Sequence, residues 1–309
     1  MVRRKSKRQE PPGPCGFLVV DKPVGWTSHD VVEAARRWFG TRRVGHLGTL
    51  DPLATGVLPL AIREATKLIP YLPEAVKKYS GTIKLGVSTD TFDAEGREVG
   101  RYDGPFPDET TVKDALLQFV GEIMQTPPLY SAVKYGGEPL YKLARRGESV
   151  EPPSRKVNIR QIVLKAYDPP DLGISVTCGP GTYVRAIAND LGQVLNCGAH
   201  LADLRREESG PFRIEMACVP DLLDSKEPSQ LAECLISPHE ALQISMIELP
   251  DEKVRLIRNG NRIYEPTVTL GIRRPGQRFM AGDLKGQLVG LLELRPDKNL
   301  HPLRVFPAD

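Results

Sequence analysis

Residues 44–56 read VGHLGTLDPLATG and contain three glycines, one proline and a single carboxylate, that of Asp51. So many residues that interrupt helices and strands predict a long loop. Pro52 removes a backbone donor and keeps Asp51 extended, while the glycines allow the backbone to approach a ligand closely. An Asp-Pro pair alone is typical of a plain turn. The whole segment instead favours a functional loop, since binding and catalytic residues are often carried by loops on a rigid scaffold.

Regular elements are expected on both sides of this loop. GFLVVD (16–21) and residues 57–62 are short apolar runs, which predict buried strands. Thr27 and Asp30 have the spacing of a capping box, and apolar residues then recur at helical spacing until Gly40. A strand and a helix are therefore predicted before the loop, and a second strand directly after it.

The rest of the chain mixes strands and helices without a regular repeat. Strands are predicted for residues 77–87, 129–135, 156–167 and 173–178, and helices for residues 111–120, 138–146 and 183–195. Strand, helix and strand do not alternate as they do in a doubly wound sheet. The fold class is therefore predicted to be α+β, with a large mixed, mainly antiparallel sheet flanked by helices and loops.

Composition divides the chain into three parts. Residues 1–14 form a basic tail with few apolar side chains, which predicts disorder. Residues 15–247 are expected to form a large domain, the end of which is an acidic, helical connector that starts near residue 216. Residues 248–309 hold short apolar runs separated by Gly and Pro, and these predict a small β-rich domain.

The overall composition excludes several classes of protein. The 309 residues are 40% hydrophobic and carry a formal net charge of +3, as is ordinary for a soluble globular protein. No apolar stretch is long enough to span a membrane and no secretory signal is apparent, so a cytoplasmic location is expected. Five cysteines without a CxxC pair favour neither a disulfide framework nor a zinc ribbon. The total charge gives no sign of a nucleic-acid partner, although basic residues gather in 36–46, 134–160 and 250–309.

Five ordered segments resemble the tRNA pseudouridine synthase B (TruB) family. They are DKPVGWTSHDVV (21–32), VGHLGTLDPLATGVLPL (44–60), KKYSGTIKLGVSTDTFDAEG (77–96), QTPPLYSAVKYGGEPLYKLARRG (125–147), and GTYVRAIANDLG with CGAHLADLRR (181–206). The resemblance covers roughly residues 16–215. It implies the pseudouridine-synthase fold and an isomerase that converts uridine at position 55, in the T-loop of tRNA, to pseudouridine. It also implies that neither a metal nor an organic cofactor is needed.

The resemblance assigns the chemistry to three residues. Asp51 matches the family's nucleophile, which attacks either the sugar or the uracil ring, and the sequence leaves both routes open. Arg185 matches the partner that keeps this carboxylate ionised in a pocket without water. Tyr79 matches the tyrosine that stacks on the flipped uracil and could accept the proton lost at carbon 5. By residue type alone, Arg185 is typical of a surface arginine and Tyr79 of a half-buried strand residue.

Further residues are expected to bind the substrate. His46 matches the residue that fills the space left by the flipped nucleotide, and Tyr183 and Leu204 match positions that line the pocket. Lys22, with Pro23, resembles a motif that supports the catalytic loop, and we group it with the substrate-binding residues. Contacts to RNA phosphates are predicted for Arg42, Arg43, Lys134, Arg145 and Arg146.

Two segments are expected to add to RNA binding. Residues 134–160 carry seven basic and three acidic side chains, and Gly136-Gly137 suggests a hinge, so this segment is a possible RNA-clamping insertion that closes over the T-arm. The domain at 248–309 suggests the PUA-like RNA-binding domain that many relatives carry. The expected partner is the T-arm stem-loop of tRNA, with no membrane and no obligate protein partner. Leu53 after Asp51-Pro52 favours the stand-alone bacterial type, because the RNA-guided branch typically carries lysine there.

Two functions from other classes remain open. A catalytically silent RNA-binding protein on the same scaffold would be expected to lose Asp51, Tyr79 or Arg185, and all three are present. A metal-dependent hydrolase could use His46 and Asp51 as ligands, but no third and fourth ligand follows at a suitable spacing. The sequence therefore favours the isomerase and predicts no metal site.

Overall fold

The computed structural model describes residues 13–307 of the chain, apart from residues 75, 132, 149 and 267–273. Disorder was predicted for residues 1–14, and residues 1–12 of that segment lie outside the described residues. The first apolar run predicted in the C-terminal part, VTLGI at 268–272, also lies outside the described residues.

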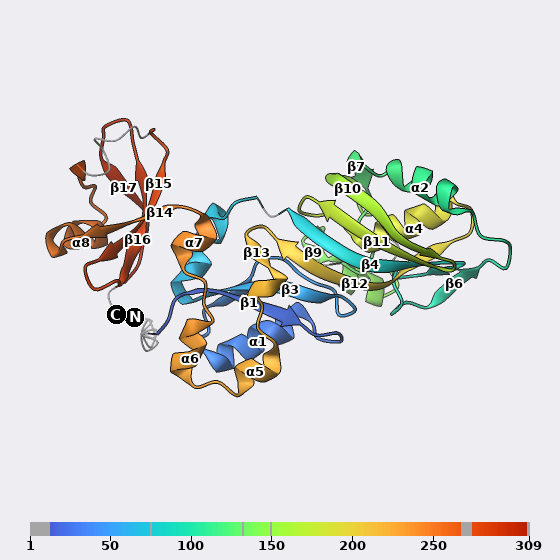
Figure 1. The fold of residues 1–309 in the computed structure, drawn as a ribbon, viewed down its shortest axis with the longest axis horizontal. Helices are drawn as coiled ribbons and strands as arrows, with labels where there is room; N and C mark the ends of the chain where they lie inside the picture. The colour runs from blue at the N-terminus through green and yellow to red at the C-terminus, as the bar shows by residue number, and fades with distance from the viewer. Residues whose placement is uncertain (1–12, 75, 132, 149, 267–273, 308–309) are drawn as a thin grey trace.

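Within the described residues, nine strands form one large sheet, in which the main path runs β1-β3-β12-β4-β11-β10-β7 (Figure 1). These strands are β1 (Gly16–Lys22), β3 (Thr55–Ile62), β4 (Lys77–Leu85), β7 (Gly121–Gln125), β10 (Arg155–Asp168), β11 (Asp171–Cys178) and β12 (Ala199–Ser209). Strand β2 (Val44–His46) adds to β3, and β13 (Phe212–Arg213) adds to β12. Every pair is antiparallel except β12 and β3, which run parallel. The predicted mixed, mainly antiparallel sheet is confirmed.

Helices lie where the sequence predicts them. The first is α1 (Ser28–Trp38), which begins with the capping box of Thr27 and Asp30. The other predicted helices are α2 (Glu109–Leu117), α3 (Leu140–Arg145) and α4 (Val184–Val194), and the connector holds α5 (Pro220–Asp224), α6 (Pro228–Glu233) and α7 (Pro238–Leu242). Short 3-10 helices are η1 (Arg63–Tyr71) and η2 (Ile214–Met216). In Figure 1, α1, α5 and α6 lie beside β1 and β3, whereas α2 and α4 lie beside the other half of the sheet.

Two local predictions were wrong, and some strands were not predicted. Residues 44–46 were expected in a loop but form β2, since an edge strand needs only one row of hydrogen bonds and Gly45 pairs with Ala61. Of the strand predicted at 129–135, only β8 (Lys134–Tyr135) forms, paired with β9 (Glu138–Pro139), because the backbone at Ser131 and Val133 binds the start of α3 instead. Strand β12 was not predicted, since its sequence AHLADLRREES has no clear apolar alternation. A hairpin of β5 (Val87–Thr89) and β6 (Glu98–Arg101) was also not predicted.

Strand β1 is buried on both faces, which explains its continuous apolar run. Leu18 and Val20 belong to the core that α1 covers and that reaches across the sheet to Tyr79. Phe17 and Val19 point to the opposite face, where they belong to a second apolar cluster. Burial of side chains of this size contributes roughly 1.5–3 kcal/mol each. The strand therefore fixes the half of the sheet from which the Asp51 loop extends.

The C-terminal part forms a separate four-stranded sheet, seen at the left of Figure 1. Its strands are β14 (Ser245–Leu249), β15 (Arg278–Asp283), β16 (Leu288–Leu294) and β17 (Leu300–Val305), and α8 (Asp251–Arg258) follows β14. Strand β14 starts before the predicted boundary at residue 248 and already pairs with β15. The small β-rich domain is confirmed, while its likeness to a PUA domain stays a prediction.

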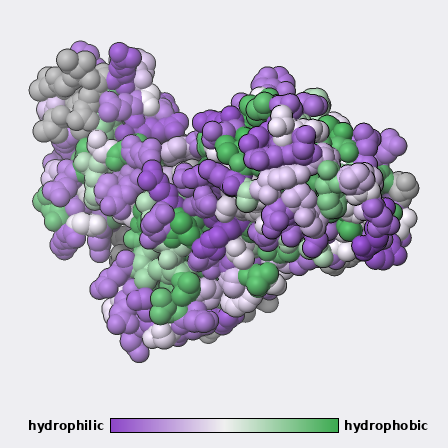
Figure 2. Space-filling model, turned by 45° about the vertical axis from the view of Figure 1, so that its right-hand side comes forward, coloured by the Kyte–Doolittle hydropathy of each residue, from purple (hydrophilic) through white to green (hydrophobic). Residues whose placement is uncertain are grey.

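The surface view in Figure 2 shows hydrophilic residues over most of one face, with apolar residues in scattered patches. Across the described part of the chain, no helix combines the length and the apolar character that crossing a membrane requires.

The two halves of the large sheet meet where β3 touches β12, through Thr55 and Gly56 opposite Arg205 and Arg206. Gly56 has φ +96°, and a Cβ at this position would lie 2.2 Å from the carbonyl oxygen of Arg206. No other residue type fits such an approach of one backbone to another. The junction next to the Asp51 loop therefore depends on a glycine.

Replacing Gly56 by alanine tests this junction. Gly56→Ala is expected to lower the free energy of unfolding by about 3 kcal/mol or more, since left-handed strain adds to a backbone overlap. Gly40→Ala is the matched control, because Gly40 also has a positive φ, +55°, but has no atom within 4 Å of an added Cβ. The control is expected to cost about 1 kcal/mol. Equal losses in urea denaturation would show that the junction tolerates a side chain.

Candidate active site

The loop between β2 and β3 is pinned on the side that faces α1. The side chain of Ser28, at the start of α1, accepts a hydrogen bond from the backbone N–H of Leu50 at 2.8 Å and donates one to its carbonyl at 3.0 Å. The backbone N–H of Gly25 donates to the carbonyl of Pro52 at 2.9 Å, and Ala54 N–H closes a turn onto the carbonyl of Asp51 at 3.0 Å. Hydrogen bonds therefore fix the backbone before and after Asp51, and with it the direction of the Asp51 side chain.

Lys22 supports this loop from below. Its side chain is 0% exposed, and its ammonium donates to the carbonyls of Trp26 at 2.6 Å, Pro23 at 2.9 Å and Pro52 at 3.2 Å. Burial lowers the pKa of Lys22 to about 8, and the charge of Asp51 opposes that shift. The grouping of Lys22 with substrate-binding residues is therefore corrected, because a buried ammonium bound to three carbonyls is not available to a substrate.

Arg185 joins Asp51 to two other segments. It lies in the first turn of α4 and is only 4% exposed. Its Nε is 3.1 Å from Oδ2 of Asp51, and Nη1 is 3.4 Å from Oδ2 of Asp93. The same guanidinium donates to the carbonyls of Tyr130 at 2.7 Å and Thr91 at 3.2 Å. The pairing of Asp51 with Arg185 that the sequence predicts is present.

Asp93 is the residue that sequence reasoning missed. It is 3% exposed, and its carboxylate accepts hydrogen bonds from Thr91 Oγ1 at 2.5 Å and from the backbone N–H of Glu95 at 3.2 Å. Its segment, TDTFDAEG, was part of a recognised motif, but three acidic residues stand there and the sequence does not single one out. Only the packing of this turn against α4 shows which carboxylate faces Arg185.

The ionisation of Asp51 is set by opposing influences. Burial raises the pKa of this carboxyl, the positive charge of Arg185 lowers it, and the negative charge of Asp93 raises it again; the net direction is upward. The side chain is 39% exposed, so solvent reaches it from the cavity. Arg185 therefore offsets part of the cost of a carboxylate at this position.

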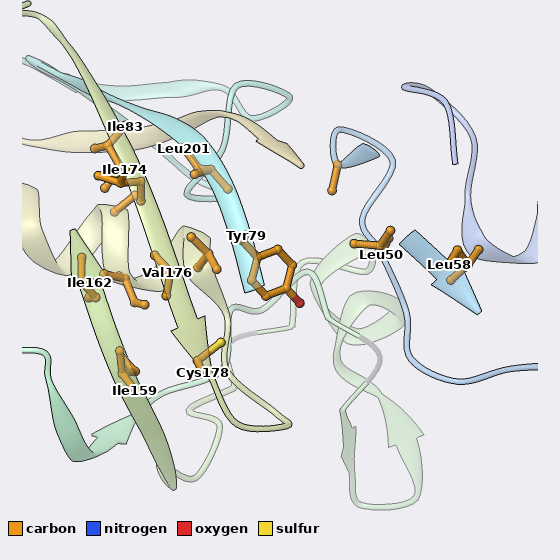
Figure 3. Packing of buried hydrophobic residues seen from close by; sticks show 14 of the residues in the cluster. Leu50, Leu58, Tyr79, Ile83, Ile159, Ile162, Ile174, Val176, Cys178 and Leu201 are labelled. Atoms are coloured by element: carbon orange, nitrogen blue, oxygen red, sulfur yellow. The ribbon is translucent and has the colours of Figure 1, made fainter. Parts of the chain in front are cut away.

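Tyr79 lies on β4 at the centre of the site. It is 5% exposed, and Figure 3 shows its ring between the core residues of the sheet, such as Val176 and Cys178, and Leu50 of the catalytic loop. Burial raises the pKa of its hydroxyl, while neighbouring Arg206 lowers it. The ring is thus a flat wall, and its hydroxyl keeps its proton at neutral pH.

Arg206 is a second buried cation that sequence reasoning missed. It is 0% exposed and donates from Nε to the carbonyl of Val57 at 2.7 Å, from Nη2 to that of Gly48 at 3.1 Å and from Nη1 to that of Thr49 at 3.3 Å. The last two acceptors belong to the catalytic loop. Arg206 therefore ties this loop to β12, whereas Lys22 ties it to β1.

These side chains enclose a cavity of about 410 Å³, a size in the range of small-molecule sites. Tyr183 and Leu204 line it, as the sequence predicts, together with Asp51, Tyr79 and Arg185. The guanidinium groups of Arg155 and Arg185 lie over the ring of Tyr183. The Cζ atom of Arg155 is 5.1 Å from the ring centroid, and that of Arg185 is 5.8 Å from it. The remaining wall residues are Thr49, Leu50, Ala54, Lys77, Ser131, Val133, Arg155, Gly181, Thr182, Val184 and Leu201.

His46 lies outside this cavity. It is exposed at the end of β2, and its Nδ1 accepts from the backbone N–H of Gly48 at 3.4 Å. Burial of part of the ring and the charge of Arg206 lower the pKa of His46, so the imidazole is neutral at pH 7. Its place on the rim, next to the catalytic loop, leaves the predicted role in filling a vacated RNA stack as a prediction.

The predicted phosphate contacts lie at two separate places. Arg42 and Arg43 are exposed beside the end of α1, where Arg43 pairs with Glu64. Lys134 is exposed on β8, and Arg145 ends α3. Arg146 pairs with Glu138 at 2.8 Å and with Glu148 at 2.7 Å. Within the described ranges, no group of three or more His, Cys, Asp or Glu side chains is arranged to hold a metal ion.

Comparison with known proteins agrees with this geometry. Residues 36–184 match the model "TruB family pseudouridylate synthase (N terminal domain)", and residues 185–243 match "tRNA pseudouridylate synthase B C-terminal domain". A tRNA pseudouridine synthase B from Geobacter sulfurreducens is 44% identical over 79% of this chain and 81% of its own. One from Xanthomonas campestris (strain 8004) is 42% identical over 94% of both chains.

Solved structures agree on the fold. A chain in the crystal structure of a Cbf5-Nop10-Gar1 complex matches with a TM-score of 0.65 at 25% identity, over 98% of this chain and 92% of that one. A chain of the archaeal box H/ACA sRNP Nop10-Cbf5 complex matches with a TM-score of 0.64 at 23% identity, over 99% and 94%. The resemblance noted in the sequence is thereby confirmed, and this chain belongs to the TruB family of pseudouridylate synthases.

Proposed function

We propose that this protein isomerises the uridine at position 55, in the T-loop of tRNA, to pseudouridine. The observation that carries the proposal is the carboxylate of Asp51, held 3.1 Å from the buried guanidinium of Arg185, in a cavity walled by the ring of Tyr79. The relatives named tRNA pseudouridine synthase B support tRNA as the substrate.

Asp51 acts as the nucleophile in this proposal. The bond between C1′ of the ribose and N1 of uracil breaks, a bond from C1′ to C5 forms, the hydrogen on C5 leaves as a proton, and N1 takes up a proton. The net reaction is an isomerisation and needs no oxidant or second substrate. Whether the carboxylate attacks the sugar or the uracil ring, it must be ionised first, and Arg185 supplies the positive charge that favours this form.

Tyr79 receives the uracil after it has left its stack in the RNA. Its buried ring offers a flat apolar face to the base, and stacking on an aromatic side chain is typical of enzymes that extrude their target nucleotide. The hydroxyl lies next to Arg206, the charge of which lowers its pKa, although burial outweighs this influence and the net direction is upward. We assign to this hydroxyl the relay of the proton lost from C5: its oxygen accepts that proton while its own proton passes to the solvent in the cavity.

RNA binding is proposed to rely on basic side chains at two separate places in the structure. Arg42 and Arg43 lie beside the end of α1, while Lys134, Arg145 and Arg146 belong to the segment that starts at β8. Arg146 already binds two glutamates, so a phosphate would have to compete with them. We keep the closing of residues 134–160 over the T-arm, and RNA binding by the C-terminal β domain, as parts of this proposal.

The enzyme is proposed to act in the cytoplasm and without an obligate protein partner. The absence of an obligate protein partner is supported by Leu53, which follows Asp51-Pro52 where the RNA-guided branch typically carries lysine. The direct test of the whole proposal is incubation of the purified protein with an unmodified T-arm transcript, followed by mapping of pseudouridine. Product at the T-loop uridine is expected with EDTA present, whereas inhibition by EDTA would favour the metal-dependent hydrolase.

Removal of the nucleophile is expected to abolish this activity. Asp51→Asn keeps the shape of the side chain but not its charge, so turnover should fall by about a thousandfold or more. Asp171→Asn is the matched control, since Asp171 is an exposed carboxylate on β11, and it should leave turnover unchanged. Pseudouridine formation by Asp51→Asn at the wild-type rate would refute the mechanism.

The same variant is expected to be more stable at neutral pH. The pKa of Asp51 is raised in the folded state, so folding favours its protonated form; this stabilisation is full at low pH and is lost as the pH rises through the folded pKa. At pH 7 the ionised carboxyl of Asp51 therefore lowers the free energy of unfolding, whereas an asparagine would not. The melting temperature of Asp51→Asn should exceed that of the wild type at pH 7, and the difference between the two should vanish below about pH 4. A gap that widens at low pH would contradict the upward direction of the pKa.

The hydroxyl of Tyr79 is tested separately from its ring. Tyr79→Phe keeps the stacking surface, so KM should change by less than about threefold, while kcat should fall by roughly a hundredfold if the hydroxyl transfers a proton. Arg206 retains its three carbonyl acceptors in this variant, and its melting temperature should stay near that of the wild type. Unchanged kcat would exclude the hydroxyl from proton transfer.

A further inference from the structure

Lys77 faces the same cavity as the catalytic residues but has no assigned role. It is the first residue of β4, and Tyr79 follows two positions later, so both side chains point to the same face of the sheet. Both line the cavity with Asp51. A Cβ on Gly48 of the catalytic loop would lie 3.3 Å from Nζ of Lys77. The ammonium is therefore located between the strand and the loop that carries the nucleophile.

The Lys77 ammonium lacks an acceptor. Within the described part of the chain, it donates no hydrogen bond and forms no ion pair, although the side chain is partly buried. The other buried cations near the loop differ in this respect, because Lys22 and Arg206 each donate to three carbonyls. Nζ of Lys77 is not among the buried nitrogen and oxygen atoms that lack a partner, so the ammonium stays open to the cavity. Such a group in a substrate cavity points to an acceptor that the ligand brings.

The charges around the cavity also favour an anionic ligand. Its walls carry one carboxylate, Asp51, against three cations, Lys77, Arg155 and Arg185. Arg185 is already shared between Asp51 and Asp93. Arg206, although not in the wall, places a further positive charge near Lys77. The cavity therefore has an excess of positive charge on the side of β4.

We propose that Lys77 binds the backbone phosphate next to the target uridine once that nucleotide has been flipped into the cavity. The inference rests on the proposed function and adds a substrate contact to it. Lys77 lies beside Gly48 and the exposed Thr49, and thus toward the rim, where the RNA backbone must stay while the base enters. Lysine is suited to this contact, because its ammonium binds phosphate as a point charge.

This contact makes binding depend on pH. Burial, followed by the charge of Arg206, lowers the pKa of Lys77 to about 8, and a bound phosphate would raise it again. Affinity should therefore be full below pH 8 and fall as the pH rises above 8, by at most about tenfold per unit. The groups that face Lys77 do not titrate in this range: Arg206 of β12 stays charged, and burial raises the pKa values of Tyr79 and of Cys178 on β11.

The test measures binding of a T-arm stem-loop in the Asp51→Asn background, which removes both turnover and the titration of Asp51. Adding Lys77→Met should weaken Kd about tenfold at pH 7 and reduce the slope of log Kd against log salt by roughly 0.7–0.9. It should also remove the contribution of Lys77 to the pH dependence between 7 and 9, so that only the contribution of Lys22, the pKa of which is also about 8, is left. Lys77→Arg should restore the affinity and the salt slope, and its Kd should depend on pH no more than that of Lys77→Met, because a guanidinium stays charged.

Lys78→Met is the matched control. Lys78 is the next residue on β4, points to the opposite face and pairs with Glu207 at 3.3 Å and Glu208 at 3.8 Å. Lys78→Met removes the same charge from the same strand as Lys77→Met does, and it should leave the pH dependence of binding intact. Equal effects of Lys77→Met and Lys78→Met, or a Kd for Lys77→Met equal to that of its parent, would overturn the proposal.

A modified RNA identifies the acceptor. One of the two phosphates beside the target uridine is replaced by an uncharged methylphosphonate in each of two stem-loops. With one of them the protein that retains Lys77 should lose about tenfold in affinity, while the Lys77→Met protein should lose nothing further. Additive losses with both stem-loops would show that Lys77 contacts another group and would overturn the assignment. Since these experiments need no product, absence of pseudouridine formation by the wild type would refute the proposed function separately.

Discussion

The buried guanidinium of Arg185 is the contact on which the site depends. It binds the Asp51 loop, the turn at Asp93 and the carbonyl of Tyr130 at once. A carboxylate in a partly closed cavity would be driven to protonate, and a fixed cation opposes this. Arginine fits the task because it keeps its charge when buried and presents several donors in one plane. Arg185 thus favours the ionised form of Asp51 and also forms part of the cavity wall.

The catalytic loop is held in place from two sides by cations that donate to carbonyls of the loop or of its neighbours. Lys22 reaches it from β1 and Arg206 from β12, and both are fully buried with carbonyl acceptors. Carbonyls satisfy these charges without adding negative charge near Asp51. Gly56 lets β3 and β12 approach closely beside the loop. Support of the loop and the chemistry proposed for Asp51 therefore belong to different residues, and Lys77 is distinguished from both groups because it has no acceptor among the described residues.

Sequence patterns located most of the elements and the main catalytic residues, but not the connections between them. The apolar run of β1, the capping box at Thr27 and the loop around Asp51 are local features, so they could be predicted. Strand β12 was missed because charged residues such as Arg205 and Arg206 occupy it, and Arg206 is buried only through contacts with β3 and its loop. Lys22 was grouped with the wrong function for the same reason, since its acceptors are backbone carbonyls that no sequence pattern shows.

The sequence by itself determined the α+β class and the family, and it singled out Asp51, Tyr79 and Arg185 as the residues to which we assign the chemistry, because short motifs encode local conformation and residue type. The tertiary structure alone decided which acidic residue, Asp93, shares Arg185, and which cations are satisfied by the protein. Both depend on contacts between residues far apart in the chain, 92 positions for Arg185 and Asp93. Burial and pKa follow from such contacts, and so they are properties of the folded chain rather than of any single motif.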